Sequence, residues 1–300
     1  MSPAGGSGLP RLAVTLPQFS ERAGPALEAC RDAWRLGFGG AFVFDHLWPL
    51  GAPRRPALEG WTLLAAIAAE VGGRGGGFRV GTLVTRAGLR APALVGRMAT
   101  TVGEAAGVPP IIGVGRGDLA NRDENLAFGL PFPGAAERSR AVEDTVAALR
   151  GPLAGSPAPD VWVGGTGPSG RELAGRLADA WNGWGLTPEE LAAGLAGVRR
   201  AATEAGRDPG GVAGTWGGQV LVAPGQPEAE AMLARWGEGR APGEAARVVA
   251  GDPETVLARL RALADAGAAW SVLAFVGGSA AQMRALLAAA AALPARGPNG

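Results

Sequence analysis

The residues of this chain that could do acid–base chemistry are few. His46 is the only histidine, and it follows Asp45 at the end of a short apolar run. A second candidate segment, GRGD at residues 115–118, also follows an apolar run. In it, Asp118 could handle a proton and Arg116 could pair with an anion. The ordinary alternatives are a structural histidine and a surface ion pair between Arg116 and Asp118.

Several other chemistries are excluded by composition. The chain has no lysine, so it can form no Schiff base with a carbonyl or with pyridoxal phosphate. One histidine and one cysteine cannot build a zinc or iron–sulfur site of their own, and a disulfide within the chain is impossible. Cys30 lies in the middle of an expected helix, where we expect inert packing. If the protein is an enzyme, its reactivity therefore comes from a borrowed cofactor.

A glycine-rich turn follows the apolar run Asp160–Val163. Its sequence, GTGPSG at residues 165–170, matches the G-x-G-x-x-G pattern of dinucleotide-binding turns. That site also needs an acidic residue about 20 positions further on, at the end of the next strand, and Asp179 comes too early. The turn would still place backbone N–H groups at a helix N-terminus. These groups could bind a phosphate or form only a tight, capped turn.

Tryptophans lie at or just beyond several expected strand ends. Trp48, Trp184 and Trp216 are the three that we expect to line an apolar substrate pocket. Core packing is the ordinary alternative for a large aromatic side chain.

Composition and charge bound the class of protein and its partners. The formal net charge is +1, and no segment concentrates arginine, so a nucleic-acid partner is not expected. No apolar run is long enough to span a membrane, and residues 1–10 do not read as a signal peptide. We expect a cytoplasmic protein. At 47% hydrophobic residues, the 300-residue chain can bury a large core. We expect loose ends at residues 1–9 and 294–300.

Short apolar runs alternate with amphipathic segments of helical period. Strands are expected at Arg11–Phe19, Gly40–Phe44, Phe78–Val84, Pro110–Val114, Asp160–Val163, Ala180–Asn182, Val212–Val222 and Trp270–Val276. Helices are expected at Ala23–Leu36, Leu58–Val71, Ala91–Val102, Ala135–Arg150, Ser169–Leu177, Thr187–Ala205, Glu228–Trp236, Asp252–Ala266 and Ala280–Ala292. A long polar loop is expected from Gly115 to about Asn125.

The alternation predicts parallel strands joined by helical crossovers. A (β/α)8 TIM barrel typically needs about 250 residues, so one barrel domain over residues 1–300 fits the length. A doubly wound open sheet is the alternative, because alternation alone does not distinguish an open sheet from a closed one. In a barrel, the groups after each strand would meet at one mouth, where barrel enzymes place their catalytic residues.

With these elements in place, the chain resembles the bacterial luciferase-like flavin and deazaflavin oxidoreductases. No single motif decides this, but six occur in the right order at spacings that suit a barrel. They are GFGGAFVFDHLWPL (37–50), LEGWTLLAAIAAEVGG (58–73), RVGTLVTRAGLRAPALVGRMATTV (79–102), IIGVGRGD with NLAFGLPFP (111–118 and 125–133), VWVGGTGP with LADAWNGWG (161–168 and 177–185), and AGDPETVLARLRALADAGA (250–268).

The resemblance implies a flavin-type ring held at the mouth of the barrel. In the branch that uses the deazaflavin coenzyme F-420, His46 and Asp118 match the catalytic positions, with Asp118 as proton donor. A cis peptide bond that bulges behind the ring is implied at Leu83-Val84. The implied cofactor-binding residues are Asp45, His46, Thr82, Leu83, Val84, Gly115, Arg116, Gly164, Gly165, Thr166, Gly167 and Ser169.

Two cofactors and three functions stay open at this point. The Asp45-His46 pair and the glycine-only turn favour coenzyme F-420 and hydride transfer to or from a small organic substrate. Arg116 matches an arginine that reaches the phosphate of FMN in the luciferases, which favours an FMN-dependent monooxygenase that uses oxygen. A barrel that binds such a cofactor without turnover is the third possibility. The connection from Arg150 to Val161 is shorter than in many family members, which implies a more open entrance. Family members are often dimers, so a homodimer is possible, but the sequence alone does not decide the oligomeric state.

Overall fold

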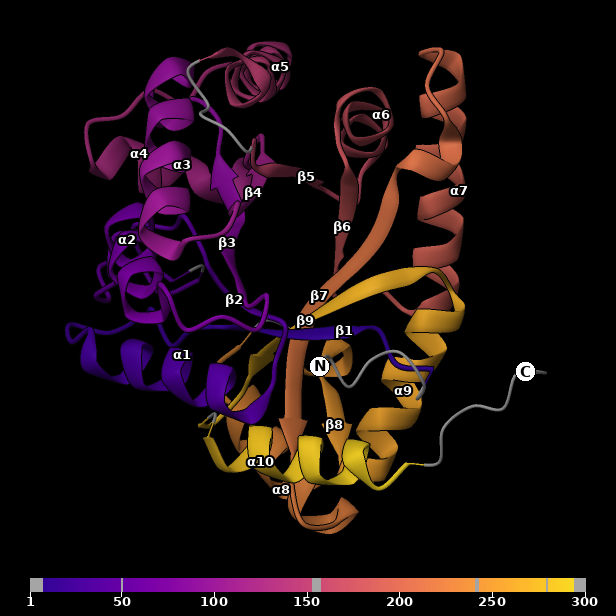
Figure 1. Ribbon diagram of the computed structural model, residues 1–300. Coiled ribbons are helices and arrows are strands. Elements are labelled where there is room, and N and C mark those ends of the chain that lie inside the picture. Colours follow the sequence, from indigo (N-terminus) through magenta and orange to yellow (C-terminus); the bar gives the residue numbers. More distant parts are fainter. Residues whose placement is uncertain (1–7, 50, 153–157, 241–242, 279, 294–300) are drawn as a thin grey trace.

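The computed structural model describes residues 8–49, 51–152, 158–240, 243–278 and 280–293. Within them, eight parallel strands close into a barrel, with the helices packed around it (Figure 1). Neighbouring strands pair in sequence order from β1 to β7, and β9 closes the barrel between β7 and β1. The barrel strands are β1 (Arg11–Thr15), β2 (Gly40–Val43), β3 (Arg79–Arg86), β4 (Ile111–Gly115), β5 (Asp160–Gly164), β6 (Ala180–Trp184), β7 (Ala213–Val222) and β9 (Ala268–Phe275). The (β/α)8 barrel predicted from the sequence is confirmed, and the open sheet is excluded.

The helices follow the predicted order. They are α1 (Gly24–Leu36), α2 (Gly60–Val71), α3 (Pro92–Ala106), α4 (Arg122–Ala127), α5 (Ala135–Arg150), α6 (Pro168–Leu177), α7 (Pro188–Glu204), α8 (Gln226–Gly237), α9 (Pro253–Asp265) and α10 (Ala280–Ala291). Local signals explain several starts. Thr187 caps α7 and Asp252 caps α9, each by accepting a backbone N–H, and proline occupies the first turn of both helices.

Several short elements were not predicted. The expected polar loop after β4 contains a short 3-10 helix, η2 (Leu119–Asn121), and then α4, so the prediction of an irregular segment was wrong there. Asp118 and Asn121 start η2 by bonding each other's backbone N–H groups. A three-residue strand, β8 (Val249–Gly251), pairs with the end of β7 outside the barrel. It is too short to give a detectable sequence period.

Aromatic side chains fill the barrel interior toward the amino ends of the strands. Trp162 packs against Phe42 at 5.4 Å and against Trp270 at 5.7 Å between ring centroids, and the Arg11 guanidinium lies over the Trp270 ring. Arg11 and Trp270 pair near the amino ends of β1 and β9, so this layer closes the amino end of the barrel. Access to the interior is therefore left to the carboxyl ends of the strands.

The short connection before β5 runs from the end of α5 at Arg150 to the start of β5 at Asp160. Residues 153–157 of it lie outside the described residues. The more open entrance that the resemblance implied for this connection is therefore not tested by the described residues. Of the loose ends predicted at residues 1–9 and 294–300, residues 1–7 and 294–300 also lie outside the described residues. No helix in the described part is long and apolar enough to cross a membrane.

Candidate functional site

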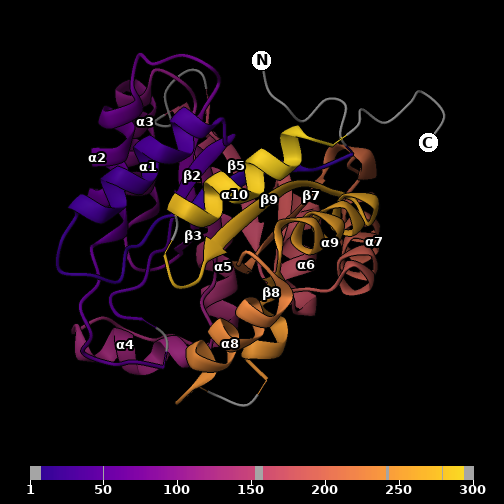
Figure 2. The same ribbon diagram turned by 90° about the horizontal axis from the view of Figure 1, so that it is seen from below.

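The candidate site lies at the carboxyl ends of the strands. There the segments after β2 and β4 come together, because Val43 pairs with Thr82 and Arg86 pairs with Gly115 across β2, β3 and β4. Helix α4 projects at this end, as does α8 after β7 (Figure 2). The mouth is thus bordered by the ends of β2, β3, β4 and β5, which carry residues that we predicted from the sequence to belong to the site.

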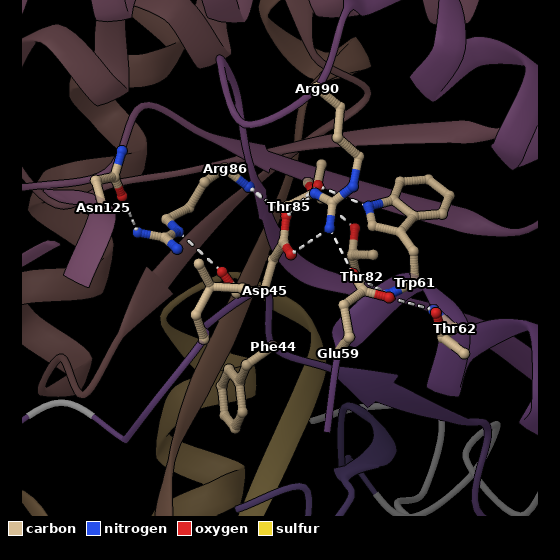
Figure 3. A network of polar contacts seen from close by, with 12 residues as sticks. Phe44, Asp45, Glu59, Trp61, Thr62, Thr82, Thr85, Arg86, Arg90 and Asn125 are labelled. Atoms are coloured by element: carbon tan, nitrogen blue, oxygen red, sulfur yellow. Dashed lines mark hydrogen bonds and ion pairs between the residues drawn. The ribbon is translucent and has the colours of Figure 1, made fainter. Parts of the chain in front are cut away.

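Asp45 is the centre of a buried polar network at the β2 and β3 ends (Figure 3). Its Oδ2 accepts a hydrogen bond from Thr85 Oγ1 at 2.7 Å and one from the Arg86 backbone N–H at 3.1 Å. Arg90 forms a two-pronged ion pair with the same carboxylate, at 2.7 and 3.1 Å. Because these donors occupy both oxygens, Asp45 fixes the β2 end against β3.

Arg90 extends this network to the start of α2. Its guanidinium also pairs with Glu59, whose carboxylate caps α2 by accepting the backbone N–H groups of Trp61 and Thr62. Burial lowers the pKa of Arg90, but its hydrogen bonds and ion pairs with Asp45 and Glu59 outweigh burial and raise that pKa above its ordinary value. The guanidinium is therefore held charged between two carboxylates.

His46 follows Asp45 and faces a carboxylate that the sequence analysis did not single out. His46 Nδ1 lies 3.4 Å from Oε2 of Glu124, which is fully buried on α4. Burial raises the pKa of Glu124, but the hydrogen bonds from His46 and Leu47 and the charge of Arg86 together hold that pKa below its ordinary value. A buried, ionised carboxylate thus lies against the single histidine.

Arg86 links the two carboxylate groups. Its Nε donates to the Asp45 carbonyl at 2.8 Å, and its Nη1 donates to Asn125 Oδ1 at 2.8 Å and lies 3.1 Å from Glu124 Oε2. Burial lowers the pKa of Arg86, and the negative charges of Glu124 and Asp45 oppose that effect. Its Nη2 is buried and has no hydrogen-bond partner within the described residues.

Val84 forms a half-exposed shelf on β3. The peptide bond Leu83-Val84 is cis, as the resemblance implied, and the register between β3 and β4 shifts at this point. A Cβ atom placed at Gly115 would lie 2.5 Å from Val84 Cγ2, and one at Gly164 would lie 2.8 Å from Val84 Cγ1. Glycine is therefore required on β4 and β5 for the Val84 side chain to lie across them. Of its neighbours, Leu83 is buried and the Thr82 hydroxyl bonds the Gly113 carbonyl at 2.8 Å.

The β5–α6 turn leaves backbone N–H groups without a cap. Gly167 occupies the position before α6 and offers no side-chain acceptor, and Pro168 follows it. Gly165, with φ at +140°, packs against Gly170, and its carbonyl accepts the indole N–H of Trp181 at 2.8 Å. Gly164, Thr166 and Ser169 keep partly or fully exposed surfaces. The N-terminus of α6 is therefore open to an acceptor from outside the chain.

The two charged residues of the GRGD segment differ in their surroundings. Arg116 is half-buried and has no ion-pair partner within the described residues. Asp118 is exposed, and its Oδ1 accepts the Ala120 backbone N–H at 2.8 Å as it starts η2. The surface ion pair between Arg116 and Asp118 that we considered from the sequence does not form.

The three tryptophans expected at the pocket separate into two groups. Trp48 packs against Phe128 at 5.9 Å, and Trp184 packs against Phe44 at 5.5 Å and is 37% exposed. Trp216 is 1% exposed, and its indole N–H donates to the Leu186 carbonyl at 2.9 Å. Trp216 belongs to the core between barrel and helices and has no free face for a pocket, because it points outward from β7.

A family model described as luciferase-like monooxygenase matches residues 9–247. The chain belongs to this family. Among curated luciferase-like relatives, the phthiodiolone/phenolphthiodiolone dimycocerosates ketoreductase of Mycobacterium sp. (strain JLS) is 31% identical over 60% of this chain and 50% of its own length. The protein of that name from Mycobacterium bovis (strain BCG / Pasteur 1173P2) is 28% identical over 66% of this chain and 59% of its own. This chain thus spans about half the length of the curated relatives it matches.

Solved structures of luciferase-like proteins share the fold. An F420-dependent secondary alcohol dehydrogenase, in complex with an F420-acetone adduct, superposes with a TM-score of 0.78 at 16% identity, covering 93% of this chain and 98% of the other. The monooxygenase RslO1 from Streptomyces bottropensis superposes with a TM-score of 0.71 at 18% identity, covering 93% and 98%. At such identities the likeness concerns the barrel alone.

Sequence reasoning missed Glu59, Arg86 and Arg90 of this luciferase-like site, and it also missed Glu124. Glu124 lies 78 positions from His46 in the chain, inside the segment expected to be an irregular loop. A signal was present in RDENLAF at residues 122–128, where acidic residues precede apolar ones as at a helix start.

Proposed function

We propose that this protein is an oxidoreductase that transfers hydride between reduced deazaflavin coenzyme F-420 and a small organic substrate. The observation that carries the proposal is the shelf formed by Val84 on glycine backbone. In strand order, His46 borders it on the β2 side and the uncapped β5–α6 turn borders it on the other. A flat ring with an anionic tail matches this order. The ring would lie on Val84, and the tail would accept hydrogen bonds from the backbone amides at the start of α6.

The residues present fit such a cofactor. Glycine at positions 115 and 164 leaves room for the Val84 side chain to lie across β4 and β5, so that an apolar side chain can support the ring. Gly167 gives α6 no side-chain cap, so a phosphate could accept the first N–H groups of the helix. The half-buried guanidinium of Arg116, which has no ion-pair partner in the described part of the chain, supplies a positive charge after β4.

Most of the predicted site residues, though not the core residue Trp216, have a proposed role. When bound, coenzyme F-420 supplies the hydride chemistry, and the protein supplies binding and orientation. His46 positions the ring or exchanges a proton, and the exposed carboxylate of Asp118 gives or takes the substrate proton. The backbone of residues 82–84 supports the ring, and Trp48 and Trp184 wall the substrate side. Arg116, Gly164, Gly165, Thr166 and Ser169 hold the phosphate. Asp45 acts through its network, since protein donors already occupy its carboxylate.

We propose a ketone and its secondary alcohol as the substrate pair. This rests on the names of two proteins: the relatives are ketoreductases, and the structural neighbour is a secondary alcohol dehydrogenase. We further propose that residues 1–300 form one domain.

Anaerobic titration with reduced and oxidised coenzyme F-420, followed by absorbance, tests the proposal. We expect saturable binding, and reoxidation of the reduced cofactor when ketones are added. His46→Ala and Asp118→Ala should slow reoxidation at least tenfold while the protein stays folded by circular dichroism. Failure of the wild type to bind would refute the proposed cofactor. Normal binding with every activity unchanged in both variants would remove the catalytic roles and favour a barrel that binds without turnover.

Arg116 favours a second candidate, an FMN-dependent monooxygenase. Its guanidinium, which has no ion-pair partner among the described residues, lies where the resemblance places a phosphate-binding arginine. Parallel titration with reduced FMN, with oxygen consumption as the readout, separates the two functions. If Arg116→Gln weakens FMN binding at least tenfold and the wild type consumes oxygen with substrate, the second function replaces the first.

A further inference from the structure

The surroundings of Glu124 determine its protonation state without reference to any cofactor. Oε1 accepts the backbone N–H groups of Leu47 and Trp48, and Oε2 accepts the Asn121 side-chain amide at 3.2 Å. Arg86 Nη1 lies 3.1 Å from Oε2. All four groups donate, so His46 Nδ1 is the one neighbour to which a protonated Oε2 could donate, and the lowered pKa of Glu124 keeps the carboxylate ionised instead. Glu124 is therefore an acceptor at both oxygens.

His46 Nδ1 faces the same Oε2 at 3.4 Å. Because the carboxylate can only accept, the proton of a neutral His46 ring must lie on Nδ1. Nε2 lies across the ring from Nδ1 and has no hydrogen-bond partner in the described part of the chain. The His46 side chain keeps 20% of its surface exposed, so this second nitrogen is the one that a ligand can reach.

We propose that Glu124 is a positioning residue that holds His46 as the Nδ1–H tautomer and presents Nε2 at the mouth as a hydrogen-bond acceptor. The arrangement resembles the way in which a carboxylate behind a histidine fixes its tautomer in acid–base enzymes and metal sites. The tautomer itself is independent of the proposed function, whereas its value to the reaction rests on that function.

The geometry also predicts what an isosteric change does. In Glu124→Gln, the amide oxygen is needed by the N–H groups of Leu47 and Trp48, which are backbone donors that cannot move away. The amide NH2 then takes the place of Oε2, where Arg86 Nη1 and the Asn121 amide lose their acceptor, and it faces His46 Nδ1. Since that group donates, Nδ1 must accept, and the neutral ring shifts to the Nε2–H tautomer.

His46 is the only histidine of the chain, so nitrogen-15 NMR of protein labelled in histidine and carrying no histidine tag reports this ring alone. We expect the shifts of the neutral wild-type ring to identify Nδ1–H. Glu124→Gln should move the population toward Nε2–H. Glu59→Gln, which removes a carboxylate near the mouth that does not contact His46, should leave the tautomer as in wild type.

A wild-type ring that carries its proton on Nε2 would overturn the inference, and this outcome needs no variant to fold. Equal tautomer populations in wild type and folded Glu124→Gln would overturn it as well. In turnover with coenzyme F-420, Glu124→Gln should lower kcat about tenfold and shift its pH profile, with cofactor affinity changed less than about threefold. A wild type that shows no turnover while its ring is Nδ1–H would refute the proposed function and leave the assignment of the tautomer standing.

Discussion

The two sides of the mouth prepare for a ligand in opposite ways. On the β2–β3 side, charged side chains are buried and paired with one another, so that Asp45, Arg90 and Glu59 hold a fixed arrangement before any ligand arrives. On the β5 side, glycine exposes backbone groups that are left without an acceptor at the start of α6. Rigid side chains suit the orientation of a reacting ring, and open backbone amides suit an anion that brings its own charge.

The starts of α6 and α7 make the same contrast in one comparison. Thr187 and Glu190 close the first turn of α7 through a reciprocal capping box, whereas Gly167 leaves the first turn of α6 uncapped. Both helices follow adjacent barrel strands and both have proline in their first turn. The difference is therefore a local choice of residue rather than a consequence of the fold.

The largest expected effect comes from breaking the buried ion pairs on the β2–β3 side of the mouth. Asp45→Ala leaves Arg90 with only the half-exposed Glu59 and removes the acceptor of Thr85, which should cost about 3 kcal/mol of unfolding free energy. Asp160→Ala is the matched control, since it breaks a 2.8 Å pair with Arg79 in which Asp160 is 49% exposed. We expect the control to cost no more than about 1 kcal/mol in urea unfolding. Equal losses would mean that the mouth network is no more than a surface pair.

The next effect concerns the shelf between the two sides. Gly115→Ala places a methyl group 2.5 Å from Val84 Cγ2 and should destabilise the protein by about 2 kcal/mol. Adding Val84→Ala removes the colliding atom and should restore most of that stability, although cofactor affinity should stay low because the shelf is gone. A double variant as unstable as the single one would show that Val84 is not what the glycine accommodates.

Gly167→Asp gives the start of α6, on the β5 side of the mouth, a side-chain cap like that of α7. Gly167 has φ −77° and ψ 167°, and a Cβ there meets nothing within 4 Å, so aspartate fits as an ordinary helix cap. Stability should rise by a few tenths of a kcal/mol, to about 0.5. Binding of a phosphorylated cofactor should fall at least tenfold, since the carboxylate occupies the N–H groups and repels the phosphate. Gly167→Ala is the control and should leave binding within about threefold. Unchanged binding in Gly167→Asp would show that the phosphate does not bind at the start of α6.

The barrel could be predicted from the sequence because its signals are local. Apolar strands, helix caps such as Thr187 and Asp252, and glycine ends recur in order, and each needs only neighbouring residues to be recognised. The contact between His46 and Glu124 could not be predicted, because it depends on how the segment after β4 folds back over the β2 end. Trp216 was misplaced for a similar reason: alternation along β7 says which residues share a face, but not which face points into the barrel.

The smallest expected effect is a pH dependence of stability that arises from Glu59 on the β2–β3 side of the mouth. Burial raises the pKa of Glu59. The hydrogen bonds that Glu59 accepts from Thr62 and Trp61 and the charge of Arg90 outweigh burial, so the pKa lies below its ordinary value. A carboxylate with a lowered pKa stabilises the fold above the pKa of the unfolded chain, about 4.3, and this contribution is lost as the pH falls through the folded value. The midpoint of thermal unfolding of wild type should therefore exceed that of Glu59→Gln at pH 7, and the gap should narrow below about pH 4. Glu172→Gln, which removes an exposed partner of Arg176, should give no gap that closes in acid. Because Glu59 is 40% exposed, its effect should stay below that of Asp45→Ala; a gap that widens in acid would mean that Glu59 is held protonated and does not pair with Arg90 as a carboxylate.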